Sequence, residues 1–453
     1  MKQSNSILLA LSSILCLAGA AFAATRPHYG GTLHVAFKET PQALAPSSLA
    51  NSPCRNLSRL VFETLVAMDG RGRIEPLLAT SWQSEVGNQR WRFLLRTGVS
   101  FHDGASFDAG AAAASLRAGH PDWKVLAAED MIIIETPSPD PELPGELALA
   151  RNAIAHGAAE HPTGTGPFSI ADWVAGKRLR LDANSQYWAG RPFLDSIDVQ
   201  FGLADRDQMI ALDLGRLDLA EVSPENIRRA RGESRIILTS EPEELMALVF
   251  ARNPRSGEET QTRNALAFGL NTNAMNDVLL QGEGEASRSL LPNWLSGYAF
   301  LFRPALETDH RTLAVSDNKP ASPVTLAYDS SDPLARLIAE RVLLNARDVG
   351  IRLELTSSAN SDLSLRRISL ACPDSHLALS ELARSLDLPR PQFVGGSVAD
   401  LYAAEKALLE SHRVIPLLHL RSAIALRPNV HGEGMVVDGT WQLTDAWLAP
   451  EKP

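Results

Sequence analysis

Apolar and polar residues alternate in several short segments, and this period of two predicts β-strands. In residues 32–37 the alternation places three large apolar side chains on one face. Residues 91–95 alternate in the same way, and the Gly87-Asn88 turn before them predicts a hairpin with the segment around Trp82. A second hairpin is predicted for residues 168–182, whose two apolar arms flank Ala175-Gly176-Lys177.

The clearest unit is a strand, a helix and a strand between residues 324 and 355. Val324 to Tyr328 is a short apolar run, and after it Asp332 and Pro333 have the residue types that begin a helix. Apolar residues then follow helical spacing until Gly350, which is typical of a helix end, and an apolar strand returns. This order implies parallel strands joined by a right-handed crossover. The helix-then-strand order recurs at 205–222 and 401–420, so the chain is predicted to be an α/β protein.

Composition and charge narrow the function classes. The 453 residues are 45% apolar and 21% charged, which is ordinary for a globular protein with room for two or three domains. The net charge of −10 argues against nucleic acid as the main partner, because phosphate binding requires a basic surface. It leaves small solutes, peptides and proteins as candidates.

The N-terminus predicts export. Lys2 is the only charge before Arg26, the run 7–20 is apolar, and Ala21-Phe22-Ala23 is a small-x-small cleavage site. These features indicate a signal peptide over residues 1–23, cleaved after Ala23, and the apolar run is short for an uncleaved membrane anchor. Leu15 before Cys16 argues against lipoprotein anchoring, so we expect a protein released into the periplasm.

Motifs of catalysis are missing or have simpler explanations. The chain contains neither G-x-S-x-G nor H-E-x-x-H. Gly164 to Pro167 lacks the Lys-Ser/Thr of a phosphate loop and is better explained as the start of a strand. His102-Asp103-Gly104 could be an acid/base pair, but a tight Asp-Gly turn is the simpler interpretation. We therefore expect no enzyme, no catalytic residue, no metal site and no cofactor.

Several sequence blocks, taken in order, resemble the large solute-binding proteins of ABC importers, the peptide/nickel-binding type known as extracellular family 5. Each block is weak alone, but their order and spacing are specific. They run over most of residues 29–300 and return at 324–355 and near 401–447. The blocks are Tyr29 to Ala36, Phe62-Glu63-Thr64-Leu65-Val66, Pro76 to Trp82, Phe93 to Gly104, Gly164 to Phe168, Asn184 with Tyr187-Trp188, and Leu214 to Asp218.

The resemblance implies an α/β fold of two lobes, the class II type of periplasmic-binding-protein-like fold, with an extra subdomain inserted in lobe I. Lobe I would comprise residues 24–48, 163–245 and 421–453, with the inserted subdomain at 49–162 and lobe II at 246–420. The hinge crossings would fall near Ala247 to Asn253 and Leu417 to Arg421. A ligand would lie between the lobes, and the closed form would dock on a membrane permease.

Few site residues can be carried over from the resemblance. In peptide-binding members an Asp late in lobe II takes the peptide ammonium, and the segment 369–374 places Asp374 there, with Cys372 close by. The alternative is that Asp374 only caps a helix beginning near His376. Glu39 and Thr40, after the opening strand, are the other candidates for ligand contact, or else part of a loop leaving that strand. Sequence does not tell whether Cys54 and Cys372 form a disulfide.

The chain also departs from the family pattern, so the ligand is not inherited. Leu44-Ala45-Pro46 replaces the usual L-D-P, alanines fill much of 109–114, and 356–400 matches poorly. We expect an importer receptor for a peptide or another small solute, monomeric and partnered by an ABC permease. The alternative is an exported scaffold or interaction protein on the same fold that has lost transport. An exported hydrolase is the third and weakest hypothesis.

Overall fold

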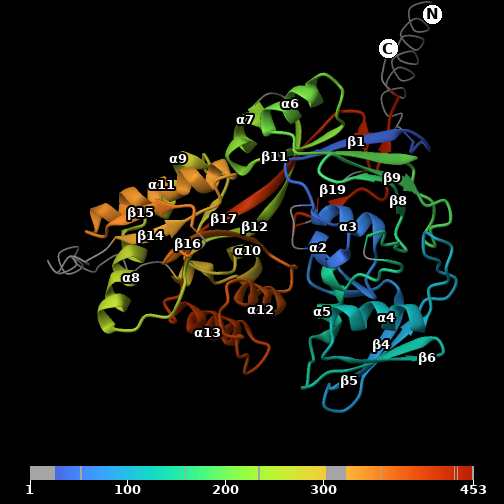
Figure 1. Ribbon diagram of the computed structural model, residues 1–453, viewed down its shortest axis with the longest axis horizontal. Coiled ribbons are helices and arrows are strands. Elements are labelled where there is room, and N and C mark those ends of the chain that lie inside the picture. The colour runs from blue at the N-terminus through green and yellow to red at the C-terminus, as the bar shows by residue number, and fades with distance from the viewer. Residues whose placement is uncertain are drawn as a thin grey trace, which may run out of the picture.

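Figure 1 shows the computed structural model, an α/β protein in which one large sheet runs through two bodies. The structure describes residues 26–50, 54–158, 160–232, 235–302, 323–358, 360–432, 434–435 and 437–450. The predicted signal peptide lies outside these residues. Among the helices that are described, none is both long and apolar enough to cross a membrane.

The large sheet has eleven strands within the described residues. Its two long strands, β12 (Ile236–Phe250) and β17 (Val414–Leu426), pair antiparallel at the centre and connect the two bodies, so we call them the crossing strands. β13 (Glu285–Ala286) pairs with β17 off the main path. In spatial order the other strands and the crossing strands are β15 (Leu353–Thr356), β14 (Val324–Ala327), β16 (Leu363–Ser369), β12 (Ile236–Phe250), β17 (Val414–Leu426), β11 (Leu219–Val222), β1 (Thr32–Phe37), β10 (Ser196–Phe201), β9 (Arg178–Ala183) and β8 (Phe168–Val174).

The first lobe is built on β1 and β8 to β11, and both faces of its sheet are covered. Leu33, Val35 and Phe37 of β1 point into one core, whereas Ala36 points into the other. This alternation follows from the period of two along a strand. The first core is covered by α2 (Pro46–Ala50) and α3 (Arg55–Val61), and the second by α6 (Asp205–Asp213) and α7 (Ile227–Gly232), which follows the short turn η3 (Pro224–Asn226).

Residues after the crossing strands complete the first lobe. Trp441 stacks on Phe37 with ring centroids 5.0 Å apart, and so adds to the first core. This region contains two short pairs of strands, β18 (Val430–His431) with β21 (Trp447–Leu448), and β19 (Gly434–Met435) with β20 (Trp441–Gln442).

A separate four-stranded sheet forms the insert, in the spatial order β4 (Ala79–Ser84), β5 (Arg90–Leu95), β7 (Met131–Glu135) and β6 (Lys124–Ala128). Trp91, Phe93 and Leu95 point from β5 into its core, as their alternation predicts. The helices α2 and α3, although they fall mostly within the predicted insert boundaries, pack in the first-lobe core. The elements of the insert are β2 (Val66–Met68), β3 (Ile74–Pro76), β4 (Ala79–Ser84), β5 (Arg90–Leu95), α4 (Ala109–Gly119), β6 (Lys124–Ala128), β7 (Met131–Glu135) and α5 (Leu143–Ala148), followed by the helical turn η2 (Ala150–Asn152).

The second lobe is built on β14 to β16 and the adjoining part of β12. Along β12, Met246, Leu248 and Phe250 face one core and Leu245 and Ala247 face the other, so this strand is buried on both sides. α8 (Gly257–Gly269), α9 (Thr272–Leu279) and α11 (Pro333–Asp348) cover the first of these faces. α10 (Asn293–Ser296), η4 (Ala299–Phe302), α12 (Ser375–Ser385) and α13 (Val398–Leu409) cover the second.

The structure confirms the predicted local units. β4 pairs with β5, and β8 with β9, as antiparallel hairpins. β14 and β15 are parallel, and the Asp332 side chain accepts the Leu334 N–H at the start of α11. Gly350 has φ +76°, a left-handed conformation that glycine adopts at low cost after a helix.

Candidate solute-binding cleft

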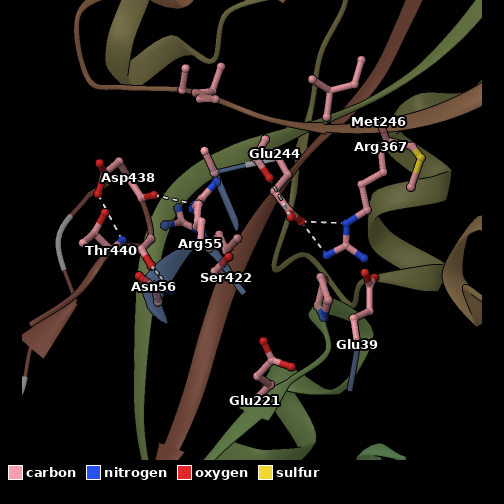
Figure 2. Close-up of a pocket in the computed structure, with 18 of the residues that line it drawn as sticks. Glu39, Arg55, Asn56, Glu221, Glu244, Met246, Arg367, Ser422, Asp438 and Thr440 are labelled. Atoms are coloured by element: carbon pink, nitrogen blue, oxygen red, sulfur yellow. Dashed lines mark hydrogen bonds and ion pairs between the residues drawn. The ribbon is translucent and has the colours of Figure 1, made fainter. Parts of the chain in front are cut away.

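A cavity of about 860 Å³ lies where the first lobe, the second lobe and the crossing strands meet. This volume is within the range of small-molecule sites. Among the described residues that line the cavity, acidic and basic residues are equally numerous. The acidic residues are Glu39, Asp205, Glu221, Glu244, Asp329, Asp332, Glu381 and Asp438, and the basic residues are Lys38, Arg55, Arg59, Arg151, Arg366, Arg367, Arg384 and Arg421. Figure 2 shows the part of the cavity around Arg55, Glu221 and Arg367.

The first lobe contributes carboxylates from the ends of β1 and β11. Glu221 Oε2 accepts the backbone N–H of Lys38 at 2.9 Å. Burial raises the pKa of Glu221 to about 7, and the charge of Glu39 adds to the rise. Desolvation also raises the pKa of Glu39, although the positive charge of Arg367 opposes that rise. These two side chains lie together at one side of the cavity (Figure 2).

Arg367 of β16 is the central cation from the second lobe. Its Nε lies 2.7 Å from Glu244 Oε2, and its Nη1 lies 3.4 Å from Asp332 Oδ2. Burial opposes the charge of Arg367, but Glu244 and Asp332 hold the pKa of the guanidinium above its ordinary value. The guanidinium is therefore charged and fixed in position on the cavity wall (Figure 2).

The crossing strand β12 presents two successive glutamates to opposite sides. Glu244 pairs with Arg367, while Glu243 Oε2 accepts a hydrogen bond from Arg55 Nη2 at 2.9 Å. Ser422 of β17 also donates to Glu243. Burial raises the pKa of Glu243 to about 7, and the charge of Arg55 opposes this. Arg55 additionally donates to the carbonyl of Asp438 at 2.8 Å, so one side chain joins α3, β12 and the segment before β20 (Figure 2).

Of the four residues predicted to contact a ligand, Glu39 lines the cavity, and Thr40, Cys372 and Asp374 are not among its described lining residues. Asp374 Oδ1 accepts the Leu377 N–H at 2.8 Å and caps α12, which was the alternative interpretation. Cys372 is buried, its Sγ lies 3.7 Å from the carbonyl oxygen of Asp374, and burial raises the pKa of the thiol.

Cys54 and Cys372 are not joined by a disulfide. Both are buried thiols, and Cys54 Sγ lies 3.6 Å from the carbonyl oxygen of Glu39. Cys54 thus belongs to the packing behind the cavity rather than to a covalent link. The described residues also contain no group of three or more His, Cys, Asp or Glu placed to hold a metal ion.

Sequence reasoning missed Arg55, Glu221, Glu244 and Arg367. A signal for two of them was present, because charged residues interrupt segments that are otherwise apolar. Glu244 lies within the strand that ends at Phe250, and Arg367 lies within β16. A charge inside a central strand requires a partner or a ligand, because burying an unpaired charge is costly. The strand that supplies the partner could not be identified from spacing alone.

The other candidate motifs are structural. Asp103 Oδ1 accepts the Ala105 N–H at 3.0 Å, and Gly104 has φ +86°, so His102-Asp103-Gly104 forms the predicted tight turn. Gly164 and Gly166 pack against the backbone of α3 before β8 begins. Neither motif lines the cavity among the described residues.

Known proteins with similar sequences support this architecture. Residues 73–369 match the family model of bacterial extracellular solute-binding proteins, family 5 Middle. The probable D,D-dipeptide-binding periplasmic protein DdpA of Escherichia coli K12 is 23% identical over 329 residues, covering 65% of this chain and 63% of DdpA. The nickel-binding periplasmic protein of the same organism is 22% identical over 355 residues, 68% of each chain. The transcriptional regulator SgrR of E. coli K12 is 23% identical over 465 residues, 93% of this chain and 78% of SgrR. The chain thus spans less than two thirds of the length of DdpA.

Solved structures with the same fold cover nearly the whole chain. The dipeptide-binding protein of Pseudoalteromonas sp. SM9913, in complex with Met-Leu, has a TM-score of 0.78 at 15% identity, covering 92% of this chain and 100% of that one. AgaA of A. tumefaciens R10, in complex with agropinic acid, has a TM-score of 0.77 at 18% identity, covering 93% and 99%. The matched family consists of solute-binding proteins and not of enzymes. From its family match and its two-lobed α/β fold, this chain belongs to family 5 of the bacterial extracellular solute-binding proteins.

Proposed function

We propose that this protein is an exported receptor that binds a short peptide between its lobes and delivers it to an ABC permease by closing over it. The observation that carries the proposal is the cavity of about 860 Å³, whose described lining has as many acidic as basic side chains. A peptide carries an ammonium and a carboxylate, and each can form charge-assisted hydrogen bonds with such a lining. Peptide ligands in DdpA and in the Pseudoalteromonas protein agree with this choice.

The lobe boundaries predicted from the sequence fit this function. Residues 246–420 would move as lobe II against the remainder, with bending in β12 and β17. The pairing of these crossing strands shifts register between Thr239 and Pro242, between Pro242 and Glu244, and between Met246 and Ala247. Such irregularities weaken the local ladder of hydrogen bonds, which supports a hinge there.

The proposal is tested on the chain from residue 24 onward, by mass spectrometry of co-purified solute and by thermal unfolding with a library of di- to pentapeptides. A bound peptide stabilises only the folded state, so the melting temperature rises with peptide concentration. Millimolar peptide without any shift would contradict the peptide assignment.

A matched pair of variants places the site. Arg367→Gln should reduce the peptide-dependent shift, because the central cation of the cleft is lost. Arg352→Gln should leave it unchanged, since Arg352 is largely exposed, pairs with Glu354 and does not line the described cavity. If both variants lost the peptide-dependent shift equally, the peptide would bind outside the cavity around Arg367.

One observation favours a second candidate function, an interaction or sensing protein without transport. SgrR, which is named as a transcriptional regulator, matches over 93% of this chain. The architecture therefore also occurs in a protein that is not named as a transporter. Uptake of the identified solute by cells with and without the gene separates the two: unchanged uptake favours the second function.

A further inference from the structure

Besides the crossing strands, the lobes also touch between the insert and α12. Met68 packs against the core of the insert and against the core of the second lobe. Leu149, which follows α5, is 4% exposed and lies within the second-lobe core. A Cβ on Gly145 would lie only 3.3 Å from Leu377 Cδ2, so the small residue permits close approach. This apolar contact is continuous with both cores.

A charge pair crosses the same contact. Arg151 of η2 donates to both carboxylate oxygens of Glu381 on α12, with distances of 2.6 and 3.0 Å. It also donates to Glu146 of α5, at 2.5 and 2.6 Å, so the guanidinium is held between carboxylates of the insert and of the second lobe. The Arg151 and Glu381 side chains are 20% and 11% exposed. A bidentate and partly buried pair of this kind is stronger than an exposed surface pair.

The contact is also part of the cavity wall. Leu149, Arg151 and Glu381 line the cleft described above. Elsewhere, Gly72 of the insert lies against the backbone of the second lobe, where a Cβ would be 3.0 Å from the carbonyl oxygen of Pro373. The insert therefore meets the second lobe along several points, and separation of the lobes has to break them together.

We propose that the contact made by Met68, Gly145, Leu149 and Arg151 on one side and Leu377 and Glu381 on the other is a latch that holds the two lobes together in solution, with Arg151 as its positioning residue. The latch needs no solute, so it does not depend on which ligand the cleft takes. A solute can then enter only when the latch opens, and the fraction of open molecules sets the apparent affinity.

The test measures the distance between the insert and the second lobe in dialysed, solute-free protein. Val86 of the insert and Val394 of the second lobe are both fully or almost fully exposed, and each is replaced by Cys and spin-labelled. Cys54 and Cys372 are buried and stay unlabelled. The starting protein should show one short distance. Arg151→Gln should lower the ratio of short to long distances by roughly thirtyfold, the lower end of the range expected when one partner of a buried charge pair is removed.

A control and a second variant make the result decisive. Arg384→Gln removes another partner of Glu381 without crossing the lobes, because both residues lie on α12. It should keep the short distance. Glu381→Gln breaks the latch from the other lobe, leaves Arg151 paired with Glu146, and should reproduce Arg151→Gln. A long distance in the starting protein, an unchanged ratio of short to long distances in both latch variants, or equal opening in Arg384→Gln would overturn the proposal, whether or not any peptide binds.

Discussion

At the scale of single residues, several of the sequence blocks that characterise the family converge on one buried carboxylate. Glu63 accepts hydrogen bonds from Thr165 Oγ1 at 2.7 Å, from Tyr187 Oη at 2.8 Å and from Trp188 Nε1 at 3.0 Å. Burial raises the pKa of Glu63, while these donors oppose the rise. Two blocks whose donors lie 102 and 124 residues after Glu63 along the chain thus join it in one hydrogen-bonded cluster between the insert and the first lobe. The resemblance located the blocks, but spacing alone did not show that they meet.

Gly164 lets its own backbone lie close to the backbone of α3, and it does not adopt the left-handed conformation for which glycine is often required. A Cβ at this position would lie 1.9 Å from the carbonyl oxygen of Val61. We expect Gly164→Ala to lower the free energy of unfolding by about 3 kcal/mol, the upper end of the usual cost of overpacking, since the clash is with backbone that cannot rotate away. Urea denaturation measures the loss.

Gly257→Ala is the matched control. Gly257 is the first residue of α8, and a Cβ there meets nothing within 4 Å. Its change should stay within about 0.5 kcal/mol. If the two alanine variants were equally stable, the close packing of Gly164 on α3 would be wrong.

At the scale of elements, sequence patterns were most informative where a segment is regular and local. The two hairpins and the unit from β14 to β15 follow from alternation, turn residues and a helix cap, all of which act over a few residues. The crossing strand β12 was not predicted as one strand. Its middle reads Glu241-Pro242-Glu243-Glu244, which interrupts the apolar pattern, and tertiary contacts with Arg55 and Arg367 keep it extended.

Asp374 gives an element-scale prediction, since its cap and its proposed role as ammonium ligand can be separated. Asp374→Ala should lower the free energy of unfolding by about 1 kcal/mol, because the Leu377 N–H loses its acceptor. Asp374→Asn keeps an acceptor oxygen and should lower the free energy of unfolding by only about 0.3 kcal/mol, because Asn and Asp are similarly good N-cap residues. Both are measured by urea denaturation.

The same Asn variant tests the ligand role. If Asp374 only caps α12, peptide-dependent thermal stabilisation is the same in Asp374→Asn as in the unchanged protein. Loss of that stabilisation in the well-folded Asn variant would restore Asp374 as the residue that takes the ammonium.

At the scale of the whole molecule, the cleft is the feature that the sequence predicts least well. The family resemblance, and not the strand pattern, made Glu39 a candidate for ligand contact, and Glu39 does line the cavity. Arg55, Glu221 and Arg367 come from α3, β11 and β16, and only the order of strands across the large sheet brings them together. That order is set by long-range pairing, which local patterns do not encode.

Three carboxyl groups spread over the molecule predict its pH dependence. Burial raises the pKa values of Glu221, Glu243 and Glu405 to about 7, from 4.5. The folded chain then binds these protons more tightly than the unfolded chain does. Their contribution to the free energy of unfolding is therefore fully present below pH 4.5 and is lost as the pH rises through 7. Burial lowers the pKa of His419 to about 4, from 6.5, so that residue opposes folding only when pH falls below 6.5. The free energy of unfolding should therefore decrease as pH rises from 6.5 to about 8.

Glu405→Gln isolates one of these groups. Glu405 accepts the Leu290 N–H and the Tyr298 hydroxyl, and its loss should flatten the decrease measured by urea denaturation over this pH range. Glu259→Gln should leave the slope unchanged, because its pairing with Arg252 lowers the pKa of Glu259 to about 2, outside the range. Identical slopes in the unchanged protein and in Glu405→Gln would contradict the assignment.

The position of β17 in the large sheet has a consequence for how the chain assembles. This strand follows every other strand of that sheet along the chain, yet it lies between β11 of the first lobe and β12. Until it is made and delivered, β11 and β12 each present an open edge with unpaired backbone groups. The nascent protein therefore carries two exposed templates for mispairing, and its two halves become one sheet only when this late strand inserts between them.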